Sequence, residues 1–147
     1  METLKDGIKV LVAYDGSDYA RKAVSEAADI AKKFKGIVTV LHVFWDPAQV
    51  AREDEVASVE GIDVRDQPSM RMLEDVEPGL KKTGVNYELR SVRSNHPPSV
   101  ILDIAEKEGY DLISMGCRGL GGAKAWLLGS VSQKVVSEAN CPVLVIK

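Results

Sequence analysis

The fold class is decided by the segment Ile8-Lys9-Val10-Leu11-Val12-Ala13-Tyr14. It is a near-continuous apolar run that Asp15-Gly16 ends, which is typical of a strand buried on both faces. Ser17 or Asp18 then caps a helix by accepting hydrogen bonds from its first N–H groups. Alanine and valine recur at helical spacing until Gly36 ends this helix. A buried strand followed directly by an amphipathic helix is the beginning of an α/β unit.

The alternation of strands and helices continues to the end of the chain. A helix is predicted from Met70, where Pro78-Gly79 should kink or stop it, and further helices begin at Pro97-Pro98 and at Ser130. The segment 87–92 is the least apolar of the strands, so we expect it at a sheet edge. The chain 1–147 therefore predicts one domain with a parallel sheet covered by helices on both faces. The later strands are expected at 37–44, 87–92, 111–115 and 142–146.

One stretch, from Trp45 to Pro68, does not follow this pattern. It holds seven acidic residues against two basic ones and has little helical or strand periodicity. Loops of this length inside compact domains are usually functional or disordered. We interpret it as a mobile acidic loop with room for a short helix.

The composition excludes several classes of protein. The 147 residues are 45% hydrophobic and 28% charged, and 19 basic against 22 acidic side chains give a net charge of −3. This balance predicts no nucleic-acid partner, and no apolar run is long enough to span a membrane. The first residues do not resemble a signal peptide. Two cysteines, Cys117 and Cys141, fit reduced thiols in a cytoplasmic protein.

The strongest chemical signal is the glycine-rich segment 116–130, Gly-Cys-Arg-Gly-Leu-Gly-Gly-Ala-Lys-Ala-Trp-Leu-Leu-Gly-Ser. It leads from a strand end into a helix start. Gly116 and Gly119 let backbone N–H groups approach an anion, and Gly129-Ser130 lies where free N–H groups and the helix dipole favour a phosphate. The spacing is neither that of a P-loop nor the dinucleotide fingerprint. The segment predicts a phosphate cradle, with a flexible surface loop before a capped helix as the alternative.

Three residues outside the glycines are further candidates. Asp15 is placed to bind a ribose hydroxyl or, through water, a divalent ion, unless it only organises the turn after the first strand. The peptide groups around Val43 are placed to read an adenine edge. Arg118 suits bidentate phosphate binding, and the alternative is a solvated loop residue.

The residues resemble the universal stress protein family over essentially the whole chain. The Gly-x-x-Gly-x9-Gly-Ser spacing at 116–130 is similar to that of the family's ATP-binding branch. The resemblance implies a Rossmann-like, adenine nucleotide α-hydrolase-like three-layer fold, with a five-stranded parallel sheet of order 3-2-1-4-5. It also implies a homodimer that pairs the C-terminal strands. The matching segments are Val12 to Ser17, Leu41-His42-Val43, Asp111 to Gly119, Leu128 to Val131 and Cys141 to Ile146.

The same resemblance implies a set of site residues and a ligand. Asp15 would lie near the ribose or a metal ion, and Val43 would hold the adenine through its backbone. The ligand would be ATP, or ADP or AMP, with Mg²⁺ or Mn²⁺. The full set of expected binding residues is Ala13, Tyr14, Asp15, Val43, Met115, Gly116, Arg118, Gly119, Gly129, Ser130 and Val131.

Three functions remain open at this point. The first is a nucleotide-dependent switch in the stress response, which needs no fast hydrolysis. No residue stands out as a general base, so the sequence does not predict an enzyme, and a slow ATPase is the second function left open. The third is a dimeric interaction protein that does not use nucleotide.

Overall fold

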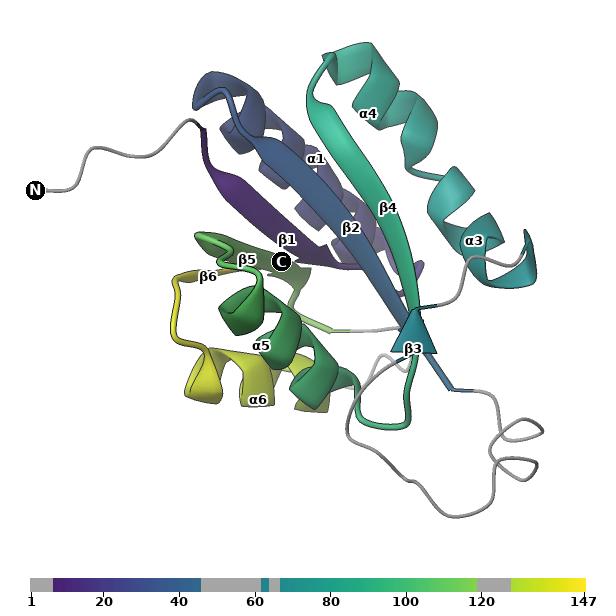
Figure 1. Ribbon diagram of the computed structural model, residues 1–147, viewed down its shortest axis with the longest axis vertical. Helices are drawn as coiled ribbons and strands as arrows, with labels where there is room; N and C mark the ends of the chain where they lie inside the picture. The colour runs from purple at the N-terminus through teal and green to yellow at the C-terminus, as the bar shows by residue number, and fades with distance from the viewer. Residues whose placement is uncertain (1–6, 46–61, 64–66, 119–127) are drawn as a thin grey trace, which may run out of the picture.

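The computed structural model describes residues 7–45, 62–63, 67–118 and 128–147. Five parallel strands form the sheet in the order β4-β2-β1-β5-β6, which is 3-2-1-4-5 when these strands are counted along the chain. This confirms the expected sheet (Figure 1). The strands are β1 (Lys9–Ala13), β2 (Ile37–Phe44), β4 (Asn86–Arg93), β5 (Leu112–Gly116) and β6 (Val143–Ile146).

A sixth strand corrects the expectation of a loop over 45–68. Strand β3 (Ile62–Asp63) is two residues long and pairs antiparallel with the end of β4, with Ile62 opposite Arg93. Helix α3 then begins at Gln67, earlier than the predicted Met70. Periodicity does not reveal a strand of two residues, because alternation needs at least four residues to show. The rest of the predicted acidic loop, residues 46–61 and 64–66, lies outside the described residues.

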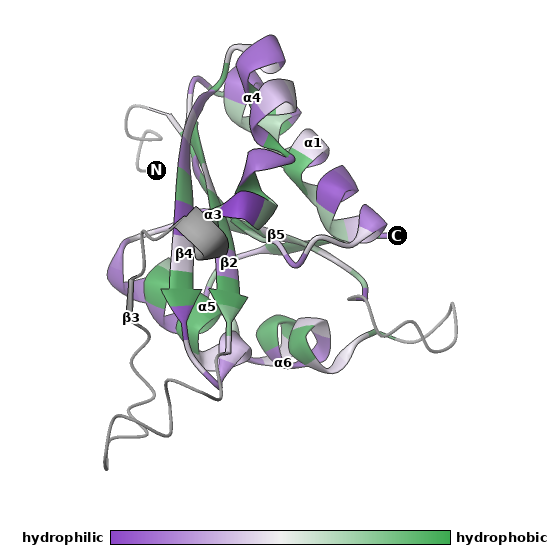
Figure 2. Cartoon of the chain, turned by 90° about the vertical axis from the view of Figure 1, so that its right-hand side faces the viewer, coloured by the Kyte–Doolittle hydropathy of each residue, from purple (hydrophilic) through white to green (hydrophobic). Residues whose placement is uncertain are grey.

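Helices cover both faces of the sheet, as predicted (Figure 1). Helices α1 (Asp18–Lys33), α3 (Gln67–Glu74) and α4 (Glu77–Thr83) pack on one face. Helices α5 (Pro97–Lys107) and α6 (Ser130–Glu138) pack on the other. In Figure 2 hydrophilic and hydrophobic residues alternate along α1, as expected of a helix with one face on a sheet.

The helix boundaries follow from local chemistry. The Ser17 hydroxyl accepts a hydrogen bond from the Ala20 N–H at 3.1 Å and so caps α1. The break expected at Pro78-Gly79 occurs earlier, between Glu74 and Glu77, and Pro78 lies in the first turn of α4. Proline is tolerated there because the first N–H groups of a helix have no partner within it. Pro78 therefore opens the second helix, where the sequence predicted a kink or a stop.

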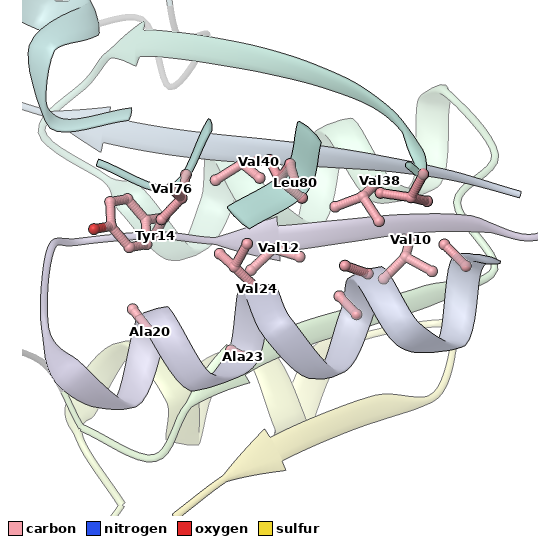
Figure 3. Packing of buried hydrophobic residues seen from close by; sticks show 14 of the residues in the cluster. Val10, Val12, Tyr14, Ala20, Ala23, Val24, Val38, Val40, Val76 and Leu80 are labelled. Atoms are coloured by element: carbon pink, nitrogen blue, oxygen red, sulfur yellow. The ribbon is translucent and has the colours of Figure 1, made fainter. Parts of the chain in front are cut away.

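Strand β1 is buried on both faces, as its apolar run predicted. Val10 and Val12 pack toward α1 and are fully buried, together with Val38 and Val40 of β2 (Figure 3). Leu11 lies in the second core, on the α5 and α6 side. Each such side chain contributes about 1.5–3 kcal/mol by burial. The buried centre of the sheet therefore holds the residues at its carboxyl edge in fixed positions.

No helix within the described ranges is both long and apolar enough to cross a membrane.

Candidate functional site

The candidate site lies where the order of the strands reverses. Strand β1 pairs with β2 on one side and β5 on the other, and Ala13 is in register with Leu41 and Met115. Beyond these positions the chain emerges as Asp15 and Gly116 at the same edge of the sheet. In open α/β sheets this edge, at the reversal point, is where ligands bind. The structure thus brings together residues that are about 100 positions apart in the sequence.

Asp15 organises the turn between β1 and α1. Its Oδ1 accepts a hydrogen bond from the Ser17 N–H at 2.9 Å, and Gly16 adopts a φ of +85°. A left-handed φ of this kind favours glycine. The carboxylate is half-buried. One oxygen of the Asp15 carboxylate therefore organises the turn, which was the alternative role predicted from the sequence.

Tyr14 belongs to the site through its backbone, whereas its side chain lies in the core. The side chain is only 2% exposed, on the α1 side of the sheet (Figure 3). Its carbonyl accepts from Nδ1 of His42 at 3.0 Å. Among the described residues its hydroxyl has no hydrogen-bond partner. Burial is the main cause that raises the pKa of this phenol, and the charge of Arg21 opposes it.

Gly116 has a steric role that the sequence did not predict. A Cβ on Gly116 would lie 2.6 Å from Cβ of Tyr19 and 3.0 Å from the backbone nitrogen of Ala20. Such distances are too short for real atoms, so the first turn of α1 occupies the space of the missing side chain. Gly116 therefore allows β5 to pack against α1.

Cys117 joins the two ends of the glycine-rich segment. Its carbonyl accepts from the Gly129 N–H at 2.7 Å and from the Ser132 hydroxyl at 2.8 Å. The Ser132 hydroxyl also lies 3.0 Å from the Gly129 carbonyl. Ser132 was not among the residues predicted from the sequence, although a serine three positions after Gly129, at the expected start of a helix, was a usable signal. The joint fixes the start of α6 against the end of β5.

The N-terminus of α6 has no side-chain cap among the residues that the structure describes. Gly129 is its N-cap residue, so no side-chain hydrogen bond caps it, and its first turn holds no acidic residue. Ser130 is exposed at the first helical position, and Val131 is half-buried against the second core. Uncapped N–H groups and the positive end of the helix dipole together favour an anion. The phosphate cradle itself stays a prediction.

Gly129 differs from Gly116 in the space around it. Its φ of −65° and ψ of 162° are open to any residue. An added Cβ would meet Cα of Arg118 at 3.4 Å and the Cys117 carbonyl oxygen and Ser132 Oγ at 3.6 Å, which are ordinary contacts. Nothing among the described residues therefore demands glycine at this position.

Arg118 is held by an aromatic residue that the sequence analysis missed. Its Nη2 donates to the Tyr19 hydroxyl at 2.6 Å, and its Cζ lies 5.1 Å from the centre of the Tyr19 ring. This hydrogen bond is the main cause that raises the pKa of the guanidinium. Both side chains are half-buried. An aromatic residue in the first turn of the helix after β1 was the only sequence signal for this partner.

Two of the expected binding residues, Val43 and Gly119, contribute no described side chain to the candidate site. The Val43 side chain packs against the second core, so only its backbone is left for a ligand. Gly119 lies outside the described residues. Within the described part of the chain, no group of three or more His, Cys, Asp or Glu side chains is arranged to hold a metal ion.

Comparison with known proteins identifies the family. The model of the universal stress protein family matches residues 8–147. The chain belongs to the universal stress protein family. A universal stress protein of Thermus aquaticus is 36% identical over 142 residues, which covers 94% of this chain and 97% of that one. The universal stress protein YxiE of Bacillus subtilis is 34% identical, covering 95% and 98% of the two chains.

Solved structures of other universal stress proteins share the fold. One from Archaeoglobus fulgidus has a TM-score of 0.71 at 28% identity, covering 95% of this chain and 93% of that one. A universal stress protein in complex with cAMP has a TM-score of 0.69 at 23% identity, covering 97% and 98%. Another from A. fulgidus, in complex with dAMP, has a TM-score of 0.67 at 23% identity, covering 97% and 100%. The fold is thus the Rossmann-like, adenine nucleotide α-hydrolase-like fold of these proteins.

Proposed function

We propose that this universal stress protein binds an adenine nucleotide at the carboxyl ends of β1, β2 and β5 and acts as a nucleotide-dependent switch in the stress response. The observation that carries the proposal is the N-terminus of α6, which no side chain of the described residues caps and which begins at a glycine where an added Cβ would make only ordinary contacts. An anion there would accept from the first N–H groups of the helix. The universal stress proteins in complex with cAMP and dAMP support an adenylate as the ligand class.

Different site residues would contact the phosphates, the adenine and the ribose of such a ligand. Ser130, the first N–H groups of α6 and the backbone near Gly116 would hold the phosphates, and the backbone of Val43 would contact the adenine. Gly129, whose N–H already donates to Cys117, would let the phosphates come close to the helix start. Asp15 uses Oδ1 for its own turn, so Oδ2 would serve a ribose hydroxyl or, through water, Mg²⁺ or Mn²⁺. A divalent ion would supply charge neutralisation to a triphosphate. Two further expected contacts, Ala13 and Met115, are paired near the ends of β1 and β5 and would lie beneath the ligand.

The first experiment identifies the ligand. The protein is purified quickly and denatured, and released nucleotide is measured by mass spectrometry. The apoprotein is then titrated with ATP, ADP and AMP by calorimetry, with and without Mg²⁺. We expect an adenylate to bind, and Gly129→Arg to abolish binding while circular dichroism shows a folded protein. Gly79→Arg is the matched control, because a Cβ at Gly79 meets nothing within 4 Å.

The same samples separate the alternatives. Phosphate release that follows ATP binding would identify a slow ATPase. An empty protein that gives no heat with any adenylate would refute nucleotide binding. A dimeric interaction protein that does not use nucleotide would then be the better interpretation.

We also propose a cytoplasmic homodimer that pairs the two copies of β6. This strand is the edge of the sheet beyond β5, and its four apolar residues are all half-buried in the single chain. Pro142 and Ile146 direct their carbonyls to β5, so by alternation the N–H of Val145 points to the open edge. Val145→Pro removes that donor and should give a monomer by light scattering, whereas Val145→Thr should remain a dimer. A wild-type protein that is monomeric at all concentrations would refute the pairing.

A further inference from the structure

Tyr19 and Arg118 join the first turn of α1 to the end of β5. The guanidinium donates to the Tyr19 hydroxyl at 2.6 Å and lies over the ring at 5.1 Å. Cβ of the same tyrosine lies in the space that a side chain at Gly116 would need. One residue of α1 therefore makes both a steric and a polar contact with the segment 116–118. We call this contact the Tyr19–Arg118 clasp.

The clasp and the open helix end lie on opposite faces of the sheet. Along β5, the Ser114 hydroxyl donates to the Ala23 carbonyl of α1, and Gly116 packs on Tyr19 of the same helix. Met115 belongs to the other core, which α6 covers. Because successive residues of a strand face opposite sides, the Arg118 side chain continues the α1 side. Its guanidinium is engaged there, whereas the uncapped N-terminus of α6 belongs to the other face.

The backbone of Arg118, in contrast, lies against the cradle. A Cβ at Gly129 would come within 3.4 Å of Cα of Arg118, and the Gly129 N–H donates to Cys117. The backbone of Arg118 therefore lies directly beside the start of α6. The clasp holds the side chain of the same residue from the α1 side.

We propose that Arg118 is a positioning residue and that Tyr19 is its anchor: the clasp sets the width of the phosphate cradle, and the guanidinium is not itself a phosphate ligand. This inference rests on the proposed nucleotide binding and assigns Arg118 a role different from the one its charge suggested. It also adds Tyr19, on another element, to the residues that determine affinity for phosphate.

The two roles of Arg118 predict opposite effects of removing Tyr19. A guanidinium that binds phosphate would be released by Tyr19→Ala, so the affinity for ATP would stay the same or rise. A guanidinium that positions the backbone would lose its anchor, so the affinity would fall about fivefold, the effect of losing one hydrogen bond. Arg118→Ala should then produce a similar loss, and the double variant no further loss. Adenosine has no phosphate, so its affinity should not change.

The test is calorimetry with ATP, AMP and adenosine on the full chain. The variants are Tyr19→Phe, Tyr19→Ala, Arg118→Ala and the double variant Tyr19→Ala with Arg118→Ala. Tyr19→Phe keeps the ring and its packing on Gly116, so it reports the hydroxyl even where Tyr19→Ala folds poorly. Lys22→Ala is the matched control, because Nζ of Lys22 lies over the same ring at 6.0 Å without bridging to β5. Thermal unfolding of each variant separates affinity from stability.

We expect Tyr19→Phe, Tyr19→Ala and Arg118→Ala each to weaken the binding of ATP and AMP and to leave the binding of adenosine unchanged. The losses in Tyr19→Ala and Arg118→Ala should combine non-additively in the double variant, and Lys22→Ala should bind ATP as the wild type does. An unchanged or higher ATP affinity in Tyr19→Phe, or fully additive losses, would overturn the clasp and leave nucleotide binding intact. A loss of adenosine affinity equal to the loss for ATP would overturn it as well, because that pattern marks a general structural defect. Wild-type protein that binds neither ATP nor AMP would overturn the proposed function and this inference together.

Discussion

The two glycines at the ends of the candidate site should respond differently to the same added methyl group. In Gly116→Ala the new Cβ would lie 2.6 Å from Cβ of Tyr19 and 3.0 Å from the Ala20 nitrogen, so helix α1 must move. Overpacking of this kind costs about 1–3 kcal/mol. In Gly129→Ala the nearest atoms are at 3.4 Å and 3.6 Å, and the backbone angles already suit alanine. Alanine there reduces the entropy of the unfolded chain and stabilises by about 0.4–1 kcal/mol.

Thermal unfolding by circular dichroism measures this difference directly. For a chain of this size 1 kcal/mol corresponds to about 3 °C. Gly116→Ala should unfold about 3–9 °C below wild type, and Gly129→Ala at or slightly above it. If nucleotide binds as proposed, Gly129→Ala should still lower the affinity of the protein for ATP. A Gly116→Ala protein as stable as wild type would refute the packing argument, and a strongly destabilised Gly129→Ala would show that the fold itself demands that glycine.

Three further predictions concern hydroxyl groups. Ser132→Ala removes a donor to the Cys117 carbonyl and should lower the free energy of unfolding by about 1 kcal/mol, measured in urea. Tyr14→Phe removes a buried hydroxyl that has no partner among the described residues and should not destabilise, whereas Tyr110→Phe breaks the 2.8 Å hydrogen bond to Thr39 and should cost about 1–2 kcal/mol. Burial raises the pKa of Tyr110 above its usual 10.0, so the stability that this group contributes is complete below pH 10. It falls as the pH rises further, because the unfolded chain loses this proton first. Tyr110→Phe should flatten that fall in urea titrations at alkaline pH, and an unchanged dependence of stability on pH would contradict the argument.

The fold was predictable because its strands are long and apolar on both faces. The runs at 8–14 and 37–44 leave no amphipathic alternative, and strand-helix alternation then determines a parallel sheet. Strand β3 could not be predicted from its own two residues, because Ile62–Asp63 is a strand by virtue of its pairing with β4. The position of the break near Pro78 was shifted for a local reason, since proline fits the first turn of a helix as well as it stops one.

The site was predictable in place but not in mechanism. The structure places Gly129 against Cys117, next to Gly116, and no side chain in the described ranges caps α6. The binding of phosphate at this place stays a prediction. The packing of Gly116 could not be predicted, because its neighbour Tyr19 comes from a helix about 100 residues earlier. The partner of Arg118 was missed for the same reason. Contacts between distant segments leave no periodic trace in the sequence.

The hydrogen bond from Gly129 to Cys117 has a practical consequence for engineering. It ties two points of the chain together at 2.7 Å, and the Ser132 hydroxyl reinforces the same carbonyl. Whatever the chain does between these points, its two ends meet at a fixed place in the fold. A fluorescent protein inserted between Leu120 and Gly121 would leave the hydrogen bonds at this joint intact, and insertions succeed best where the flanking backbone bonds are kept. If the protein binds nucleotide as proposed, the joint offers an attachment point for a genetically encoded sensor.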